Sequence, residues 1–405
     1  MRNKLLIRLL SALLALFITA GGVFAADGTS DWAKSTAESL NAFAFDMYTE
    51  LANSEDNLFI SPYSVFSAMA MLYAGTSGDA ERELRDVMRY SEELHPAMKE
   101  LRNSMEDETG ELAVANAIWP HSGFKLLPSY VGIIRDYYDG EVTQFDYEHN
   151  WRDAEDAINI WTALHTRDMI KSLFERDALM PKDRDVTSLV LTNAVYFFSK
   201  WKEPFEKDLT FDGIFYGATE RETEFMRQTN SFPYFETEDF QLLEMPYEGD
   251  RRSFVVVLPR ERDGMKSLEA SLTAGKFTDW RASVRRDRVD VYIPKFELEC
   301  EMELAHIFAS LGLRSIFEPS RDNYKKMTDS QDEMRVSRII HKTKITLDEE
   351  KTEAAAVTGI VITMTSAVMP VSETYEFRAD HPFMFFITDN STGAILFFGR
   401  FNEPE

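Results

Sequence analysis

The side chains that most often carry covalent or metal chemistry are few and scattered in this sequence. Cys300 is the single cysteine and follows a strand pattern, so we interpret it as a small packed side chain rather than a nucleophile. One cysteine also excludes an intramolecular disulfide, a thiolate zinc cluster and Cys-x-x-Cys redox chemistry. The seven histidines include no pair at metal-ligand spacing. Because neither His-Glu-x-x-His nor Gly-x-Ser-x-Gly occurs, the sequence predicts no catalytic site, no metal and no cofactor.

A more informative pattern is the long segment from Asp348 to Asp380. A connection of this length in a compact domain is uncommon and usually functional. After Glu353 it holds no charged residue until Glu373. One alternate set of positions becomes apolar along its length: Thr352, Ala354, Ala356, Thr358, Ile360, Ile362 and Met364. This alternation indicates a strand whose small residues allow it to slide into a sheet. An ordinary buried strand, or an Ala-rich helix over Glu350–Ala356, would also fit the residues alone.

The elements around this segment form a helical first half and a β-rich second half. The predicted helices are Trp32–Leu51, Tyr63–Ala74, Asp79–Met88 and Trp151–His165. The predicted strands are Glu111–Trp119, Val186–Phe198, short ones between Thr210 and Pro259, Val289–Leu298, Met334–Leu347, and a hairpin of His381–Thr388 with Ala394–Phe401. Tyr63–Ala74 is apolar or small throughout, so we expect a buried helix with Ser61 as its cap. This order predicts an α+β fold rather than a parallel βαβ array.

The first 25 residues of the 405 have the three-part pattern of a secretory signal. Arg2, Lys4 and Arg8 precede the apolar run Leu9–Ala20, and small residues end at Ala25. We therefore expect export to the extracellular space or periplasm, with no membrane anchor in the mature chain. Residues 1–25 hold three basic and no acidic residues, so their removal changes the net charge from −25 to −28. This charge argues against nucleic acid and anionic membranes as partners.

Ordered motifs make the chain similar to a serpin over Trp32–Pro404. They read NLFISPYS at 57–64, AMAMLYAG at 68–75, LTNAVYF at 191–197, MPY at 245–247, IPKF at 293–296, LGL at 311–313, EEKTEAAA at 349–356, HPFMF at 381–385 and FGR at 398–400. The resemblance implies an α+β serpin fold with helices around a large central β-sheet, two smaller sheets and an exposed reactive-centre loop at about residues 349–372. It also implies one domain over residues 26–405, and no linker in the sequence divides that range.

The resemblance implies a suicide-inhibitor mechanism and a target serine protease as covalent partner. The protease attacks the loop to form an acyl-enzyme, and the cleaved loop inserts into the central sheet as a new strand. The hinge that starts this insertion corresponds to Glu349, Glu350, Lys351, Thr352, Glu353, Ala354, Ala355 and Ala356. Small hinge residues favour the inhibitory type over a non-inhibitory serpin that acts as a binding or carrier module. Lys351 stands where the family usually has Gly, so we expect slower insertion.

In the family, the cleaved bond lies at a set distance from the start of the hinge, so the resemblance, counted from Glu349, implies a reactive bond at Thr365–Ser366, with Met364–Thr365 as the next candidate. The side chain offered is uncharged and modest in size, which disfavours trypsin-like enzymes. It fits elastase-like or subtilisin-like serine proteases, and cross-class inhibition of papain-like cysteine proteases is an alternative. We expect a monomer, and the uncharged β-forming run Ile360–Thr365 predicts that heating favours loop–sheet polymers.

Further positions correspond to conserved machinery of the family. Ser61, Ser64, Asn193 and His341 match its shutter beneath the centre of the sheet, and Trp201, Lys295 and Glu349 match its breach at the top. The ordinary alternatives are satisfied core polar groups, a surface ion pair and a core tryptophan. The cluster Arg285–Arg288 reads as a solvated edge rather than a polysaccharide site, because the whole chain is strongly acidic.

Overall fold

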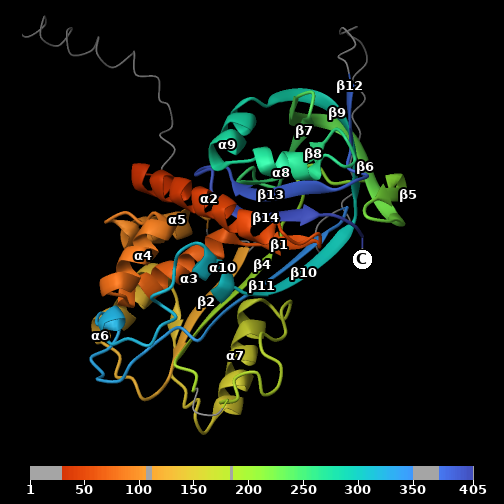
Figure 1. Cartoon of the computed structure of the whole chain (residues 1–405). Helices are drawn as coiled ribbons and strands as arrows, with labels where there is room; N and C mark the ends of the chain where they lie inside the picture. The colour runs from red at the N-terminus through yellow and green to blue at the C-terminus, as the bar shows by residue number, and fades with distance from the viewer. Residues whose placement is uncertain (1–29, 106–111, 183–185, 350–373, 405) are drawn as a thin grey trace, which may run out of the picture.

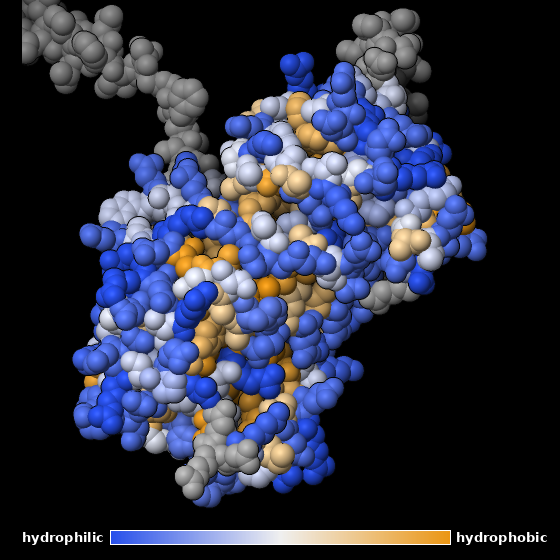
Figure 2. Space-filling view, viewed as in Figure 1, coloured by the Kyte–Doolittle hydropathy of each residue, from blue (hydrophilic) through white to orange (hydrophobic). Residues whose placement is uncertain are grey.

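The computed structural model describes residues 30–105, 112–182, 186–349 and 374–404. Within them the strands form two sheets, with helices packed along their sides (Figure 1). Most of the surface in the same view is hydrophilic, in keeping with the charge of −25 (Figure 2). The α+β class is therefore confirmed. The predicted signal, residues 1–25, and most of the predicted loop lie outside the described residues.

The helices bear out the apolar patterns of the first half. They are α2 Asp31–Leu51, α3 Pro62–Gly75, α4 Gly78–Met88, α5 Leu94–Met105, α6 Pro128–Tyr138, α7 Trp151–His165, α8 Met265–Ser271, α9 Ala274–Ala282 and α10 Ala305–Ser310, with short 3₁₀ turns η1 Lys207–Leu209 and η2 Asp322–Tyr324. Helix α3 begins as predicted, because Ser61 Oγ accepts a hydrogen bond from the Ser64 backbone N–H at 3.2 Å. It is buried along nearly its whole length and contacts β2, β4 and β14. No described helix is long and apolar enough to cross a membrane.

The five-stranded sheet has the order β10-β11-β4-β2-β3. Its strands are β2 Leu112–Pro120, β3 Glu141–Val142, β4 Leu189–Phe197, β10 Phe296–Glu303 and β11 Arg338–Leu347. The two central strands, β4 and β11, run parallel and pair directly, from Arg338 opposite Val190 to Lys344 opposite Tyr196. Every residue of β4 is buried, as expected for a strand covered on both faces.

The nine-stranded sheet has the order β1-β14-β13-β8-β7-β6-β9-β12, with β5 also paired to β6. Its strands are β1 Leu58–Ile60, β5 Phe211–Tyr216, β6 Glu220–Glu236, β7 Phe240–Pro246, β8 Arg252–Pro259, β9 Arg285–Pro294, β12 Thr374–Arg378, β13 Phe383–Asp389 and β14 Ile395–Phe401. In the described residues the two smaller sheets expected from the resemblance are thus continuous. Strand β6 joins them, because it pairs with β9 up to Tyr234 and with β7 from Tyr234 onward.

Two details of the predicted strands were wrong, and one strand was not predicted. Val289–Leu298 is not one strand, because the chain leaves the nine-stranded sheet at Pro294 and enters the five-stranded sheet at Phe296. The region after Thr210 includes the 17-residue strand β6 rather than only short strands. The segment Asp348–Asp380 contains β12, which pairs in parallel with β9. The length of β6 and the pairing of β12 could not be predicted from alternation, since they depend on which distant strand lies alongside.

Candidate functional site

A row of polar side chains crosses the middle of the five-stranded sheet. Asn116 on β2 lies directly opposite Asn193 on β4, and Asn193 lies directly opposite His341 on β11. All three are buried, as are Ser61 and Ser64 at the start of α3. The structure therefore brings together the four predicted shutter residues and adds Asn116 to them.

Hydrogen bonds connect these five side chains into one network. Asn193 Nδ2 donates to Ser64 Oγ and to Asn116 Oδ1, and Asn193 Oδ1 accepts from His341 Nδ1. On the other side of the ring, the Ser61 backbone N–H donates to His341 Nε2 at 3.1 Å. Ser61 Oγ donates to the carbonyl of Leu396 at 2.7 Å, which ties the network to β14.

This pattern fixes the protonation state of His341. Its Nε2 faces a backbone donor and must accept, while its Nδ1 faces an amide oxygen and must donate. Only the neutral ring with a proton on Nδ1 satisfies both contacts. Burial lowers the pKa of His341 to about 3, against a weaker opposing effect of the hydrogen bond to Asn193. The ring is thus neutral at physiological pH and becomes incompatible with its surroundings when protonated.

Asn116 could have been suspected from the sequence, because it is the only amide in an otherwise apolar stretch of β2. The same signal identified Asn193. What the sequence did not contain is the register that places the two side chains opposite each other, since 77 residues separate them.

A second cluster lies at the end of β11, around the first residue of the predicted hinge. Lys295 Nζ is 3.3 Å from Glu349 Oε1 and 3.2 Å from Glu224 Oε2. Glu349 also accepts a hydrogen bond from Thr210 Oγ1 at 2.8 Å, and its carbonyl accepts from the Phe205 backbone N–H at 2.8 Å. The structure therefore brings together the two members of the predicted ion pair.

The surroundings stabilise the charged forms of both Lys295 and Glu349. Partial burial acts to raise the pKa of Glu349, but the hydrogen bond from Thr210 and the charge of Lys295 outweigh it and lower that pKa. Burial likewise acts to lower the pKa of Lys295, and the contacts with Glu224 and Glu349 outweigh it and raise that pKa.

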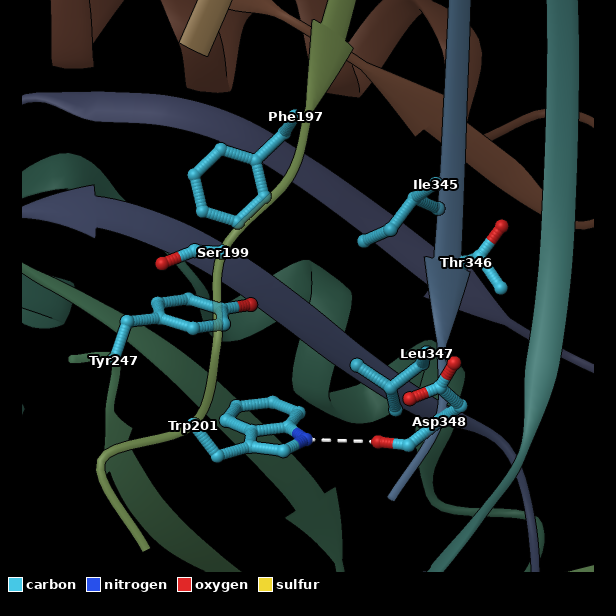
Figure 3. A pocket seen from close by; sticks show the side chains of 8 residues that line it. All are labelled: Phe197, Ser199, Trp201, Tyr247, Ile345, Thr346, Leu347 and Asp348. Atoms are coloured by element: carbon cyan, nitrogen blue, oxygen red, sulfur yellow. Dashed lines mark hydrogen bonds between the residues drawn. The ribbon is translucent and has the colours of Figure 1, made fainter. Parts of the chain in front are cut away.

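Trp201 completes this end of the sheet (Figure 3). Its indole Nε1 donates to the carbonyl of Asp348 at 2.8 Å, directly before the hinge. Its ring stacks on Tyr247 with centroids 4.8 Å apart and an interplanar angle of 8°. The two rings line a pocket between the ends of β4 and β11, together with Phe197, Ser199, Ile345, Thr346, Leu347 and Asp348. The pocket lies just beyond the end of the ladder between β4 and β11, whose last pair is Lys344 opposite Tyr196.

The remaining predictions concern the rest of the hinge, the reactive bond, Cys300 and the absence of a metal. Hinge residues Glu350, Lys351, Thr352, Glu353, Ala354, Ala355 and Ala356, and both candidate bonds, Thr365–Ser366 and Met364–Thr365, lie outside the described residues. Cys300 is half-buried on β10. The described parts of the chain contain no group of three or more His, Cys, Asp or Glu side chains placed to hold a metal.

Comparison with known proteins identifies the family of this chain. A family model described as serpin (serine protease inhibitor) matches residues 38–404. The chain belongs to the serpin family. That description is of an inhibitor, not of an enzyme, and it implies a protease as partner in general. We call the network of Ser61, Ser64, Asn116, Asn193 and His341 the shutter, and the cluster of Trp201, Lys295 and Glu349 the breach.

Named relatives extend the likeness to most of the chain. An uncharacterized serpin-like protein of Thermococcus kodakarensis is 34% identical over 379 residues, covering 92% of this chain and 86% of the relative. The human leukocyte elastase inhibitor is 34% identical over 378 residues, covering 89% of this serpin and 97% of the human protein. The crystal structure of native protease nexin-1 with heparin superposes with a TM-score of 0.82 at 28% identity, covering 92% of this chain and all of that one.

The breach ion pair of this serpin gives a stability prediction. Glu349→Gln should lower the free energy of unfolding by about 1 kcal/mol, since Gln keeps the contact with Thr210 but loses the charge interaction with Lys295. Glu224→Gln is the matched control, and its effect should be smaller. The Glu349 side chain is 7% exposed and that of Glu224 is 57% exposed, so water already weakens the second pair. Urea unfolding of the two variants tests this, and equal losses would contradict it.

Proposed function

We propose that this serpin is an exported suicide inhibitor of serine proteases with elastase-like or subtilisin-like preference. The protease serine attacks the carbonyl of Thr365, the amine of Ser366 leaves, and an acyl ester links the two proteins. The freed loop then enters the five-stranded sheet and carries the protease with it before water can hydrolyse the ester.

The observation that carries the proposal is the direct parallel pairing of β4 and β11 between the shutter and the breach. A chain that leaves β11 at Leu347 and folds back would run antiparallel to β11, and therefore antiparallel to β4 as well. One parallel ladder would be exchanged for two antiparallel ladders. Each added hydrogen bond contributes about 0.5–1.5 kcal/mol net, and the apolar alternate face of the loop would be buried, so insertion would be strongly favourable.

The sequence supports the proposed protease preference and the proposed export of the chain. Thr365, preceded by Val361 and Ile362, offers an uncharged site of modest size to the protease. The similarity of the chain to the human leukocyte elastase inhibitor is consistent with a preference for elastase-like proteases. The signal-like residues 1–25 support export, and the mature protein would act outside the cytoplasm.

The test is a denaturing gel of the chain 26–405 mixed with elastase or subtilisin. We expect a covalent band at the summed mass, and we expect none when the protease serine has been blocked beforehand. Mass spectrometry of the released fragment should give a first residue of Ser366; a start at Thr365 would select the second candidate bond. Cleavage with neither adduct nor gain in thermal stability would instead support a non-inhibitory serpin, and an adduct with papain alone would support cross-class inhibition.

A further inference from the structure

The sheet formed by β6, β9 and β12 presents an arginine-rich face at the end of the molecule where β12 begins (Figure 1). Side chains alternate along β9, so Arg286, Arg288 and Tyr292 share one side of the strand. Register places Arg227 of β6 and Arg378 of β12 on either side of Tyr292. We call these five residues, with the adjoining Phe211, the arginine face.

Two of its arginines have no acidic partner. Arg227 pairs with Asp290 at 2.9 Å, and Arg378 lies 3.5 Å from Glu376. Arg286 and Arg288 are exposed and make no ion pair within the described residues; Arg286 donates only to the carbonyl of Ser231, at 3.2 Å. Among the residues that the structure describes, four arginines and two carboxylates give this face a net charge of +2, on a chain whose net charge is −25.

The face also has an aromatic part, in which Phe211 is exposed and Tyr292 is buried beneath the guanidinium groups. The guanidinium of Arg378 lies 3.7 Å from the ring centre of Tyr292, and that of Arg227 lies 5.1 Å from it. Phe211, which is 39% exposed, meets the edge of the same ring with centroids 6.0 Å apart. Arginine and aromatic residues together are enriched in the centres of protein–protein interfaces, and stacking holds these guanidinium groups in place. This composition favours a folded protein over a polysaccharide as the partner.

The position of the face favours the protease as that protein. Thr374, the first residue of β12, lies directly opposite Arg288. Only eight residues separate Thr374 from Ser366 of the proposed reactive bond. Even a fully extended chain of that length spans at most about 30 Å, which is within the diameter of a small protease domain. A protease bound at that bond would therefore have part of its surface within reach of the arginine face.

We propose that the arginine face is a secondary docking surface for target proteases that carry acidic residues beside the active-site cleft. This inference rests on the proposed function and narrows it to a class of partner. The face offsets the repulsion that an acidic protease meets from the rest of this acidic chain. Its effect is on the rate of encounter, since complementary surface charges mainly accelerate association.

The test compares two double charge reversals of the chain 26–405. Arg286→Glu with Arg288→Glu alters the face. Arg176→Glu with Arg321→Glu is the matched control, because both of its arginines are exposed, form no ion pair in the described parts of the chain and belong to no strand of either sheet. Both variants change the net charge equally. The probe is subtilisin, either unmodified or with its surface lysines succinylated to carboxylates, each normalised by its activity on a small peptide.

The quantity measured is the second-order rate constant for loss of the intact chain at low and high salt. For the parent we expect succinylated subtilisin to react faster than the unmodified enzyme at low salt, with the advantage lost as salt rises. The face variant should react with the succinylated enzyme about tenfold more slowly than the parent, and the control variant within about twofold of it.

Equal rates for the face and control variants would overturn the proposal. So would a loss of heparin retention in the face variant with unchanged protease rates, because the face would then be a polysaccharide site. The rate constant counts both adduct and cleaved chain. If only cleaved chain forms, the proposed inhibition fails, while the rate comparison still decides the role of the arginine face.

Discussion

If this serpin inhibits by loop insertion, as proposed, replacing Thr352 by arginine should convert it from an inhibitor into a substrate. Thr352 belongs to the alternate set of loop residues whose side chains we expect to face the core after insertion, and a buried unpaired charge costs several kcal/mol. Insertion would stall and the acyl ester would be hydrolysed. The number of inhibitor molecules consumed per protease molecule should rise from about one to above about ten, read from the ratio of adduct to cleaved chain.

Glu353→Arg is the matched control for this substitution. It places the same side chain one position further along, on the face expected to remain in solvent, where a long basic side chain costs little. It should therefore inhibit nearly as well as the parent. A Thr352→Arg variant that inhibits as well as the parent would show that insertion of this strand is not the mechanism.

The shutter gives the second large effect, a loss of stability in acid that depends on His341. The unfolded chain binds a proton on this residue near pH 6.5, whereas the folded chain does not until about pH 3. Over that window the unfolded state binds more protons, so the free energy of unfolding falls as the pH falls. One pH unit corresponds to about 1.4 kcal/mol, which gives a loss on the order of 2–3 kcal/mol between pH 6.5 and pH 4.5.

His341→Gln removes the titrating group, and the exposed His306→Gln serves as its control. Urea unfolding should show that the stability difference between the parent and His341→Gln shrinks by this amount as the pH falls from 6.5 to 4.5. The difference between the parent and His306→Gln should stay constant. A parallel pH dependence for the parent and His341→Gln would mean that carboxylates, rather than the shutter histidine, govern acid sensitivity.

Much of the shutter could be predicted because four of its members match positions of the family that the chain resembles. The residues alone indicate less: Ser61, Ser64, Asn193 and His341 are polar residues in apolar segments, and each needs a hydrogen-bond partner if it is buried. The part of Asn116 in this network was not predicted, because strand register determines which residue it contacts. Register depends on packing between segments that are far apart in the chain, and neither composition nor alternation encodes it locally.

The division between β9 and β10 was missed although the sequence carries a signal of it. Apolar residues stand at odd positions up to Ile293 and at even positions from Phe296, so the alternation changes phase where the chain passes from one sheet to the other. Lys295 occupies the crossing point, and this places its charge beside Glu349. The residue type at the breach was therefore predictable from the resemblance, while the reason for its position became visible only with the sheet order.

The order of strands in the nine-stranded sheet constrains how the chain can fold during synthesis. Strand β14, near the end of the chain, lies between β13 and β1, and Leu58 is paired with Arg400. Ser61 of the shutter likewise depends on the carbonyl of Leu396. Neither the sheet nor the shutter can close until β14 has been made, so loop-closure entropy and high contact order delay folding. Strand β1 therefore stays unpaired while all the strands between it and β14 are synthesised, and its apolar residues are exposed to aggregation meanwhile.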